Sequence, residues 1–459
     1  MKANQKYKRL IKLFFMFGIT SILIGIYSWI WIVYYNDILE YPFYRRGNWM
    51  MIFLYGALLM LFMNLYGGFK VGYLKRGNLI YSQILAVIFT NVFTYLQIAA
   101  IDKHFLTPVY LFWMTGIELM IILIWTMIYH WIYGKMFPPR KMLLISGIRS
   151  DYHLLEKINS REDKYEICQT INIDHGIEMI EREILKYDGV IVGDILSHER
   201  NLLLKYCFSK SIRAYSVPKI SDILLKSSVE LNLFDSPLLL SRNEGLAIEQ
   251  QFIKRMIDIL GSLFGIIIAS PFFLLIAIGI KITDHGPVFF KQERLTRDFK
   301  VFQIYKFRTM IQEAENDGIA RLAEEGDSRI FPVGKMLRRT RLDELPQLFN
   351  ILRGDMSLVG PRPERPELEA QIEKEIPEFS YRLKVKAGLT GYAQIYGKYN
   401  TTPYDKLKLD LTYIRNYSLL LDLKLIFMTP KIMFMKEATE GVKIDKSTEK
   451  IQKNNCKEM

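Results

Sequence analysis

Long apolar runs dominate the first third of the chain. Four stretches are apolar over about 20 residues, the length of helix that crosses a bilayer: Leu10 to Val33, Trp49 to Tyr66, Leu79 to Ala100 and Val109 to Tyr133. This pattern predicts a membrane protein with a four-helix transmembrane bundle over residues 1–137. The first run is too long for a signal peptide, so we expect it to be retained.

Charged residues around these runs indicate an orientation. Lysines and arginines lie before the first run, between the second and third, and after the fourth, whereas the two other loops are nearly balanced in charge. By the positive-inside rule, the N-terminus and everything after Lys135 are expected to be cytoplasmic.

After Pro138 short apolar runs alternate with polar helical stretches. This alternation predicts a cytoplasmic α/β domain of Rossmann-like type over residues 138–235, followed by a linker over residues 236–249. The first turn, Ser146-Gly147-Ile148-Arg149-Ser150, has only one of the glycines of a GxGxxG dinucleotide site. We therefore favour a degenerate module with a structural or regulatory role over an active nucleotide site.

A fifth apolar stretch, Met256 to Ile282, has basic residues at both ends. Ser270 and Pro271 lie near its middle, where proline removes an amide donor and bends the helix. These features predict a re-entrant hairpin over residues 254–282 that enters the membrane and returns, with the Ser270 hydroxyl bonded to a freed carbonyl. A kinked transmembrane helix is the alternative.

Composition narrows the chemistry only a little. Lysine and arginine outnumber aspartate and glutamate by 61 to 48, and half of the residues are hydrophobic. The three cysteines, Cys168, Cys207 and Cys456, form no CxxC pair, and the six histidines show no metal-binding spacing, so we expect neither disulfides nor a zinc site. We expect the membrane to be a partner, and no nucleic acid.

Two adjacent carboxylates, Asp343 and Glu344, lie within the arginine-rich run Arg338 to Gln347. Arginines bind phosphate oxygens with planar forks, while a carboxylate pair holds a divalent cation or supplies a nucleophile. Taken alone, the run is also compatible with a solvated charged turn. Pro346 should place both carboxylates in or just before the first turn of a helix.

Four further motifs surround this run: Gly286 to Phe290, Tyr305 to Met310, Gly354 to Pro363 and Ala387 to Gln394. In this order the motifs resemble the bacterial sugar transferases that act as polyprenyl-phosphate hexose-1-phosphate transferases, over residues 249 to about 429. The four apolar runs and the α/β module resemble the larger members, which start exopolysaccharide or capsule synthesis. Two positions depart from the pattern, with Thr296 in place of a glycine and Ala387 in place of a proline.

The resemblance implies transfer of a sugar 1-phosphate from a UDP-sugar donor to undecaprenyl phosphate, with release of UMP. It implies a mainly α catalytic domain over residues 250–442, cytoplasmic at the bacterial inner membrane. Asp343 corresponds to a nucleophile that forms a covalent phosphosugar intermediate, and Glu344 to its partner in proton handling or metal positioning. Both would hold Mg²⁺, which with the arginines neutralises the diphosphate.

The resemblance also suggests residues that bind the substrate. Arg338 is the first candidate for a contact with the phosphates, and Lys306 and Arg308 are weaker candidates that are equally compatible with ion pairs to nearby acids. Pro361-Arg362-Pro363 is expected to hold the nucleotide, or to form a rigid turn. Ser270-Pro271 matches the break in the family's re-entrant helix.

Residues 411 to 427 suggest an amphipathic helix on the membrane face or a core-facing helix, and residues 443–459 a polar tail. The alternative function is a membrane-anchored nucleotide-binding regulator without catalysis. A transporter is disfavoured, because the four runs hold few ionisable residues beyond Glu118 and His130. No motif distinguishes one hexose from another, and homo-oligomerisation stays open.

Overall fold

The computed structural model describes residues 2–147, 152–233, 235–241, 245–311, 327, 329–397 and 401–433. The chain divides into two units, Met1–Pro218 and Lys219–Met459.

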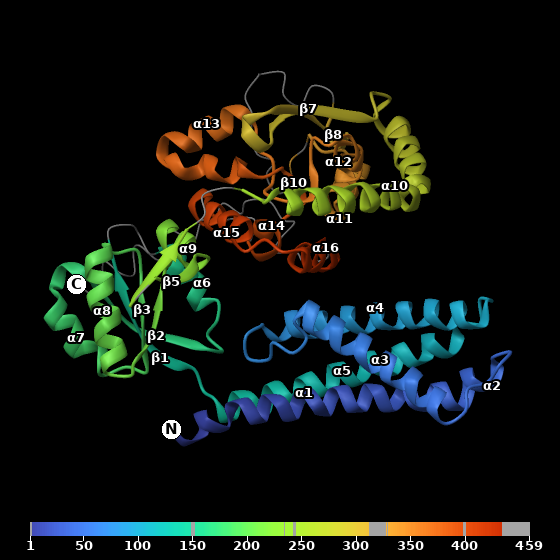
Figure 1. The fold of residues 1–459 in the computed structure, drawn as a ribbon, viewed down its shortest axis with the longest axis horizontal. Helices are drawn as coiled ribbons and strands as arrows, with labels where there is room; N and C mark the ends of the chain where they lie inside the picture. Colours follow the sequence, from blue (N-terminus) through green and yellow to red (C-terminus); the bar gives the residue numbers. More distant parts are fainter. Residues whose placement is uncertain are drawn as a thin grey trace. The chain divides into compact units, whose positions relative to one another are not determined.

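Long helices open the first unit (Figure 1). They are α1 (Lys2–Ile30), continued by a π-helical turn (Trp31–Tyr35) and α2 (Asn36–Ile38), then α3 (Arg46–Tyr66), α4 (Arg76–Asp102) and α5 (Val109–Met136). Each predicted apolar run lies within one of these helical segments. Together with α10 of the second unit, they are the five helices of the described chain that are long and apolar enough to cross a membrane. A helix satisfies its own backbone groups, as lipid requires.

Polar side chains join these helices internally. The Tyr55 hydroxyl donates to Oε1 of Glu118 at 2.6 Å, and Nδ2 of Asn91 donates to Oε2 of Glu118 at 2.7 Å. The ring of Tyr27 stacks on that of Tyr55 with centroids 4.0 Å apart. Side chains of α3 and α4 therefore meet at the buried carboxyl group of Glu118 on α5, whose oxygens both accept hydrogen bonds, and α1 packs on this group through the Tyr27 ring.

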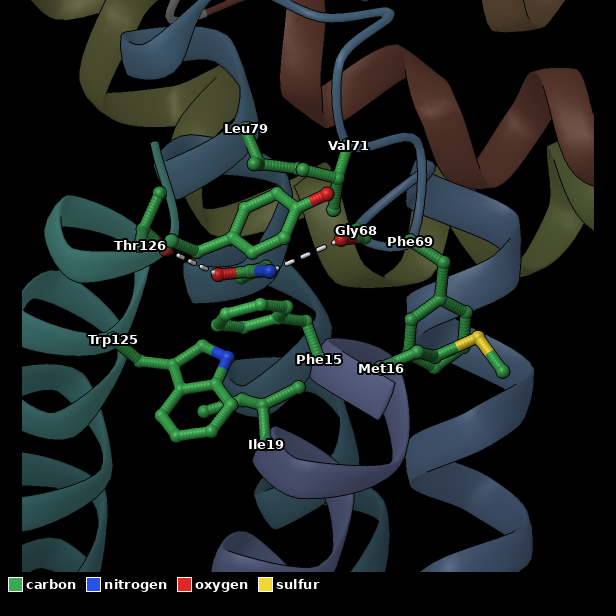
Figure 2. A pocket seen from close by; sticks show the side chains of 11 residues that line it. Phe15, Met16, Ile19, Gly68, Phe69, Val71, Leu79, Trp125 and Thr126 are labelled. Carbon is green, nitrogen blue, oxygen red and sulfur yellow. Dashed lines mark hydrogen bonds between the residues drawn. The ribbon is translucent and has the colours of Figure 1, made fainter. Parts of the chain in front are cut away.

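A small cavity lies between α1, α4, α5 and the loop after α3 (Figure 2). The Gln83 side chain, which lines it, bridges two of its walls: Nε2 donates to the carbonyl of Gly68 at 3.0 Å and Oε1 accepts from the Thr126 hydroxyl at 2.9 Å. Most of the other lining side chains are apolar, among them Phe15 and Trp125. The bridging amide ties α4 to α5 and to the loop, so we interpret the cavity as structural.

The rest of the first unit is a parallel sheet with helices on both faces (Figure 1). Its strands are β1 (Arg140–Ser146), β2 (Tyr165–Asn172), β3 (Gly189–Val192) and β4 (Arg213–Ser216), and its helices α6 (Tyr152–Asn159), η2 (Ile173–His175), α7 (Ile177–Ile184) and α8 (Ser197–Ser209). Alternate β1 residues face opposite sides: Leu143 packs with α7 and α8, and Leu144 with α6. The predicted α/β domain is therefore present.

The strand order is β2-β1-β3-β4, with β1 inside the sheet. A dinucleotide-binding Rossmann half has the order 3-2-1, so this sheet has the flavodoxin-like order instead. The glycine of the predicted turn has a packing reason, because a Cβ at Gly147 would lie 2.2 Å from the carbonyl oxygen of Asp194. Ile148, Arg149 and Ser150 lie outside the described residues.

The border of the α/β domain differs from the prediction. The second unit begins at Lys219, and α9 (Ile220–Lys226) belongs to it: Ile223 packs in its core, and Nε of Arg415 donates to the Ser227 hydroxyl at 2.7 Å. Residues 236–249 are not simply a linker, because β6 (Ser236–Leu240) pairs antiparallel with β5 (Val229–Leu233). Pro237 lies within β6, because proline is tolerated in edge strands such as those of a two-stranded sheet.

The helix α10 (Ile248–Asp284) contains Pro271 and changes direction part-way along its length (Figure 1). The Ser270 hydroxyl donates to the carbonyl of Ile267 at 2.8 Å, as predicted for a side chain beside the helix break. The parts of α10 before and after Pro271, its first and second legs, both pack on the rest of the second unit. Gly261 approaches Leu358, and Ile280 lies in a core with residues 307, 331 and 337.

The remaining elements of the second unit are mostly short helices. In chain order they are β7 (Phe289–Leu295), η3 (Arg297–Phe299), β8 (Val301–Phe307), α11 (Pro332–Thr340), η4 (Leu342–Glu344), α12 (Gln347–Arg353), β9 (Ser357–Val359), α13 (Pro366–Glu375), η5 (Pro377–Lys384), β10 (Gly388–Thr390), α14 (Tyr392–Tyr396), α15 (Pro403–Arg415) and α16 (Leu419–Met433).

Residues 411 to 427 do not form one helix. α15 ends at Arg415 and α16 begins at Leu419, and Leu411 and Tyr413 are buried in the core of the unit. The prediction of one amphipathic helix was wrong because the apolar residues of this segment belong to two helices that share a core. The predicted tail, residues 443–459, lies outside the described residues.

Candidate active site

Asp343 and Glu344 lie in a tight turn between two short helices. Helix α11 ends where Arg341 adopts a left-handed φ of 56°, and the 3₁₀ turn η4 carries both carboxylates. Pro346 then caps α12, a position that suits its fixed φ. The acidic pair therefore stands directly before a helix, as predicted.

Glu344 is buried among three cations. Its Oε1 accepts from Nη2 of Arg362 at 2.7 Å and from Nζ of Lys306 at 3.1 Å, and its Oε2 lies 3.7 Å from Nη1 of Arg341. Burial alone would raise the pKa of Glu344, but Arg362 and the two other cations outweigh burial and hold this pKa well below its usual range. Glu344 therefore stays ionised at neutral pH.

Asp343 has a different environment. Its side chain is only partly buried, and within the described residues no hydrogen-bond donor or ion-pair partner holds it. Burial and the neighbouring charge of Glu344 raise the pKa of Asp343 to about 6, and the nearby cations, Lys306 first among them, offset this only in part. An unengaged carboxylate that is ionised at neutral pH is what nucleophilic attack requires.

The three predicted cations before the acidic pair have different positions. Lys306, on β8, is an ion-pair partner of Glu344, and Arg338, in the last turn of α11, lowers the pKa of Asp343 by its charge. Arg308 is buried directly after β8, and its backbone amide donates to the carbonyl of Val288 at 3.0 Å. The described contacts therefore bring Lys306 and Arg338 to the acidic pair.

Pro361-Arg362-Pro363 follows β9, and close backbone packing fixes its position. A Cβ at Gly388 would lie 2.0 Å from the backbone nitrogen of Gly360, and one at Gly360 would lie 2.3 Å from a carbonyl oxygen of residue 386. Only glycines permit this approach of β9 to β10. The Gly388 amide also donates to the carbonyl of Pro361 at 2.9 Å, so the turn that aims Arg362 at Glu344 is rigid.

Two buried arginines that the sequence did not single out hold the same turn. Arg382 donates through Nη2 to the carbonyl of Arg362, and Arg294 donates through Nη1 to the carbonyl of Pro363 at 3.2 Å. Burial lowers the pKa of Arg294 to about 10, which leaves it charged at neutral pH. Both therefore position the backbone beside Arg362.

Arg382 is itself the centre of a buried ionic cluster. Its side chain is 1% exposed, with Nε 3.1 Å from Oδ2 of Asp410 and Nη1 3.7 Å from both Glu364 and Glu369. The carboxylates come from α13, α15 and the segment after β9. No local sequence pattern marks such a cluster, because its members are brought together only by the fold.

Side-chain hydrogen bonds fix helix α12 to two neighbouring elements, β8 and α10. The Asn350 side chain donates through Nδ2 to the carbonyl of Gln303 at 2.7 Å and accepts from the amide of Tyr305 at 2.9 Å, which joins α12 to β8. From α10, Arg255 donates to the carbonyls of Ile351 and Leu352 at 2.6 and 2.7 Å and so caps the C-terminus of α12.

The two departures from the family pattern contact each other. The buried Thr296 hydroxyl accepts from the backbone amide of Ala387 at 3.1 Å and donates to the carbonyl of Asp355 at 3.0 Å. A proline at position 387 has no amide hydrogen to donate, and a glycine at position 296 has no hydroxyl to receive it. Each departure therefore supplies the partner that the other one needs.

We expect this pair to be energetically coupled. Thr296→Val leaves the amide of Ala387 buried without a partner, and Ala387→Pro removes that donor; each change should cost about 1–3 kcal/mol. The double variant has no orphan amide, so it should cost less than the sum of the single changes by about 1 kcal/mol. Thermal unfolding in detergent of the wild type and the three variants measures this difference. Strict additivity would contradict the coupling.

Comparison with known proteins gives the family of this fold and site. A family model described as bacterial sugar transferase matches residues 249–436, which include the acidic pair and the Arg362 turn. The exopolysaccharide production protein PSS of Rhizobium leguminosarum bv. phaseoli is 38% identical over 198 residues, which cover 96% of that protein and 41% of this chain. The chain belongs to the bacterial sugar transferase family. The matched region is the second unit from α10 onward.

Longer relatives in this family carry more specific names. A UDP-N-acetylgalactosamine-undecaprenyl-phosphate N-acetylgalactosaminephosphotransferase of Aeromonas hydrophila is 38% identical over 259 residues, 53% of this chain and 58% of that protein. A UDP-glucose:undecaprenyl-phosphate glucose-1-phosphate transferase of Klebsiella pneumoniae is 42% identical over 219 residues, 45% of either chain. The matched part of the chain thus spans about half the length of these sugar transferases, which act on different sugars by name.

Proposed function

We propose that this sugar transferase moves a sugar 1-phosphate from a UDP-sugar to undecaprenyl phosphate and releases UMP, as the first step of exopolysaccharide or capsule synthesis. The observation that carries the proposal is the asymmetry of the acidic pair: Glu344 is held by cations, whereas Asp343 is partly exposed and has no hydrogen-bond or ion-pair partner among the described residues. A regulator that only binds nucleotides has no need for such a carboxylate.

The first half-reaction uses Asp343 as the nucleophile. One of its carboxylate oxygens attacks the phosphorus that bears the sugar, the bond from this phosphorus to the bridging oxygen breaks, and UMP leaves with the bond's electron pair. The product is a phosphosugar joined to Asp343 as an acyl phosphate. No proton has to be removed from the nucleophile, because a carboxylate with a pKa of about 6 is mostly ionised at neutral pH.

The second half-reaction returns Asp343 to its free form. A phosphate oxygen of undecaprenyl phosphate attacks the same phosphorus, the acyl phosphate bond breaks, and the sugar leaves as a lipid-linked diphosphate. Arg362 and Lys306 are the cations placed closest to the acidic pair by direct contacts, so we assign them to the charge on the transferred phosphate. Glu344 fixes these two cations and, since it stays ionised, is poorly suited to carry protons.

The residues present fit a magnesium ion only in part. Magnesium is usually bound by one or two carboxylates together with substrate phosphates, and Asp343 offers a carboxylate without competing partners among the described residues. Glu344 would have to release one of its ion-pair partners, Lys306 or Arg362, before it could bind the magnesium ion. The ion would supply charge neutralisation on the diphosphate, and we assign its binding first to Asp343 and then to Glu344.

The packing of α10 supports a re-entrant rather than a crossing helix. On its first leg Asp258 accepts from the Ser357 hydroxyl at 2.9 Å and from the amide of Leu358 at 2.8 Å. On its second leg Ile280 packs with Phe307 and Leu337. A crossing helix would carry its second half away from the unit that its first half contacts. We therefore propose that α10 enters the membrane and returns. Since basic residues lie at both of its ends, we also propose that the catalytic unit lies on the cytoplasmic side of the bacterial inner membrane.

The reaction is tested by UMP release from membranes that contain the protein. Undecaprenyl phosphate, Mg²⁺ and a panel of UDP-sugars are supplied, and we expect release that requires both the lipid and Asp343. The active donor identifies the sugar. No release with any donor would remove the transferase assignment and favour the regulator without catalysis.

The pH dependence of transfer should report on Asp343. Its pKa is raised from 3.8 to about 6, so acidification through pH 6 protonates the nucleophile, and kcat/KM should fall about tenfold per pH unit below that value. The profile is measured between about pH 5 and pH 8, with protein integrity checked at each end. A flat profile down to pH 5 would contradict a raised pKa.

A further inference from the structure

Cations and aromatic rings gather at one end of the helix bundle, outside the catalytic unit. The ammonium nitrogen of Lys12, on α1, lies 4.3 Å from the centre of the Tyr73 ring, and that of Lys164, next to β2, lies 4.7 Å from the same ring. Two cations thus share one aromatic side chain, although each repels the other.

Lys8 extends this group by one turn of α1. Its ammonium nitrogen lies 5.3 Å from the centre of the Tyr133 ring and 5.1 Å from that of Phe137, at the end of α5. Its charge also interacts unfavourably with Arg140, the first residue of β1. We call Lys8, Lys12, Arg140 and Lys164 the basic cluster.

Negative charge does not balance the basic cluster. Within the described residues none of its four members forms an ion pair with a carboxylate. Asp163, whose charge acts on Lys164, is bound through both oxygens by Arg161, at 2.8 and 3.0 Å. Burial lowers the pKa of Lys164, and the charge of Arg161 lowers it further. The ring faces stabilise these cations but leave their net charge in place.

The basic cluster lies at the ends of two helices that are long and apolar enough to cross a membrane. The apolar segment of the first helix begins at Tyr7, and α5 ends at Met136, so a bilayer spanned by these helices would place its phosphates beside the cluster. Trp131, on α5, is 67% exposed, and Lys135 lies over its ring. An exposed tryptophan beside a lysine is typical of a helix end in the headgroup layer.

We propose that the basic cluster binds the phosphate of an anionic phospholipid, and that this headgroup bridges α1 to the first strands of the α/β domain. Partly buried ammonium and guanidinium groups donate to phosphate oxygens, and a phosphate relieves their mutual repulsion. A soluble phosphate has the same donor needs, but a phospholipid is held at this depth by its acyl chains. The bound lipid would fix the α/β domain against the bundle.

The test measures lipid retention by the full chain, purified in a neutral detergent, with native mass spectrometry. Phosphatidylglycerol and phosphatidylcholine are added in equal amounts, and we expect selective retention of the anionic lipid. The cluster variant replaces three lysines by glutamine: Lys8, Lys12 and Lys164. It should weaken phosphatidylglycerol binding about 10- to 100-fold. Equal retention of both lipids by the wild type would overturn the proposal.

Matched variants separate the cluster from charge in general. The control variant replaces three exposed lysines of the α/β domain by glutamine: Lys186, Lys205 and Lys210. It removes the same charge and should bind the lipid like the wild type. Arginine at the three cluster positions should restore binding. Equal weakening in the control variant, or full displacement of the lipid by millimolar inorganic phosphate, would contradict a phospholipid site; thermal unfolding confirms that each variant is folded.

Discussion

Asp343→Asn should lower the rate of sugar-phosphate transfer by about 10³-fold or more, because an amide cannot form the acyl phosphate. The same change should leave the fold intact. The raised pKa means that ionised Asp343 is unfavourable in the folded protein above pH 6, so its removal should keep the thermal midpoint unchanged or raise it. UMP release and thermal unfolding are measured on the same membrane preparations.

Asp298→Asn is the matched control for this variant. It makes the same change of charge and atoms on an exposed turn, where the Asp298 side chain is 78% exposed and pairs with Arg297 at 3.1 Å. Its rate should stay within about twofold of the wild type, since exposed ion pairs contribute little. If Asp343→Asn kept most of the transfer activity, the covalent mechanism would be wrong.

Arg382→Met should strongly destabilise the second unit. It leaves Asp410 and Glu369 buried at 1% and 2% exposure without their shared cation, and it removes a donor to the carbonyl of Arg362. Breaking a buried ion pair by removing one partner costs about 3–5 kcal/mol. We therefore expect the thermal midpoint of this unit to fall by about 10 °C.

Arg353→Met controls for the loss of a guanidinium. Arg353 is 71% exposed and lies 3.9 Å from Asp355, so its replacement should shift the midpoint by no more than about 1–2 °C. Adding Asp410→Asn to Arg382→Met removes one orphaned charge and should recover part of the loss. A midpoint within error of the wild type in Arg382→Met would show that the cluster contributes little.

Local patterns predicted the parts of this protein that depend on neighbours in sequence. The apolar runs correspond to helices because a single run of about 20 apolar residues can satisfy its backbone hydrogen bonds within lipid only by forming a helix. The Asp343-Glu344 turn before a helix followed from Pro346, whose φ suits a helix start. Ser270 bonded a carbonyl beside Pro271 for an equally local reason.

Contacts between distant segments escaped prediction. The cluster around Arg382 joins residues from separate helices, so no spacing reveals it. The bond between Thr296 and Ala387 connects two positions that looked like independent departures. Residues 411 to 427 were assigned to one helix, because their apolar residues do not show where α15 ends and α16 begins.

Helix α12 has seven residues, too few for an isolated helix to be stable in water. Its order comes from Asn350 bonded to β8 and from the Arg255 cap supplied by α10. The turn that carries Asp343, directly before α12, is therefore supported by the helix that we propose enters the membrane. Loosening α10 would release the α12 cap and disturb the geometry of Asp343, so the proposed mechanism makes transfer depend on how α10 is seated in the membrane.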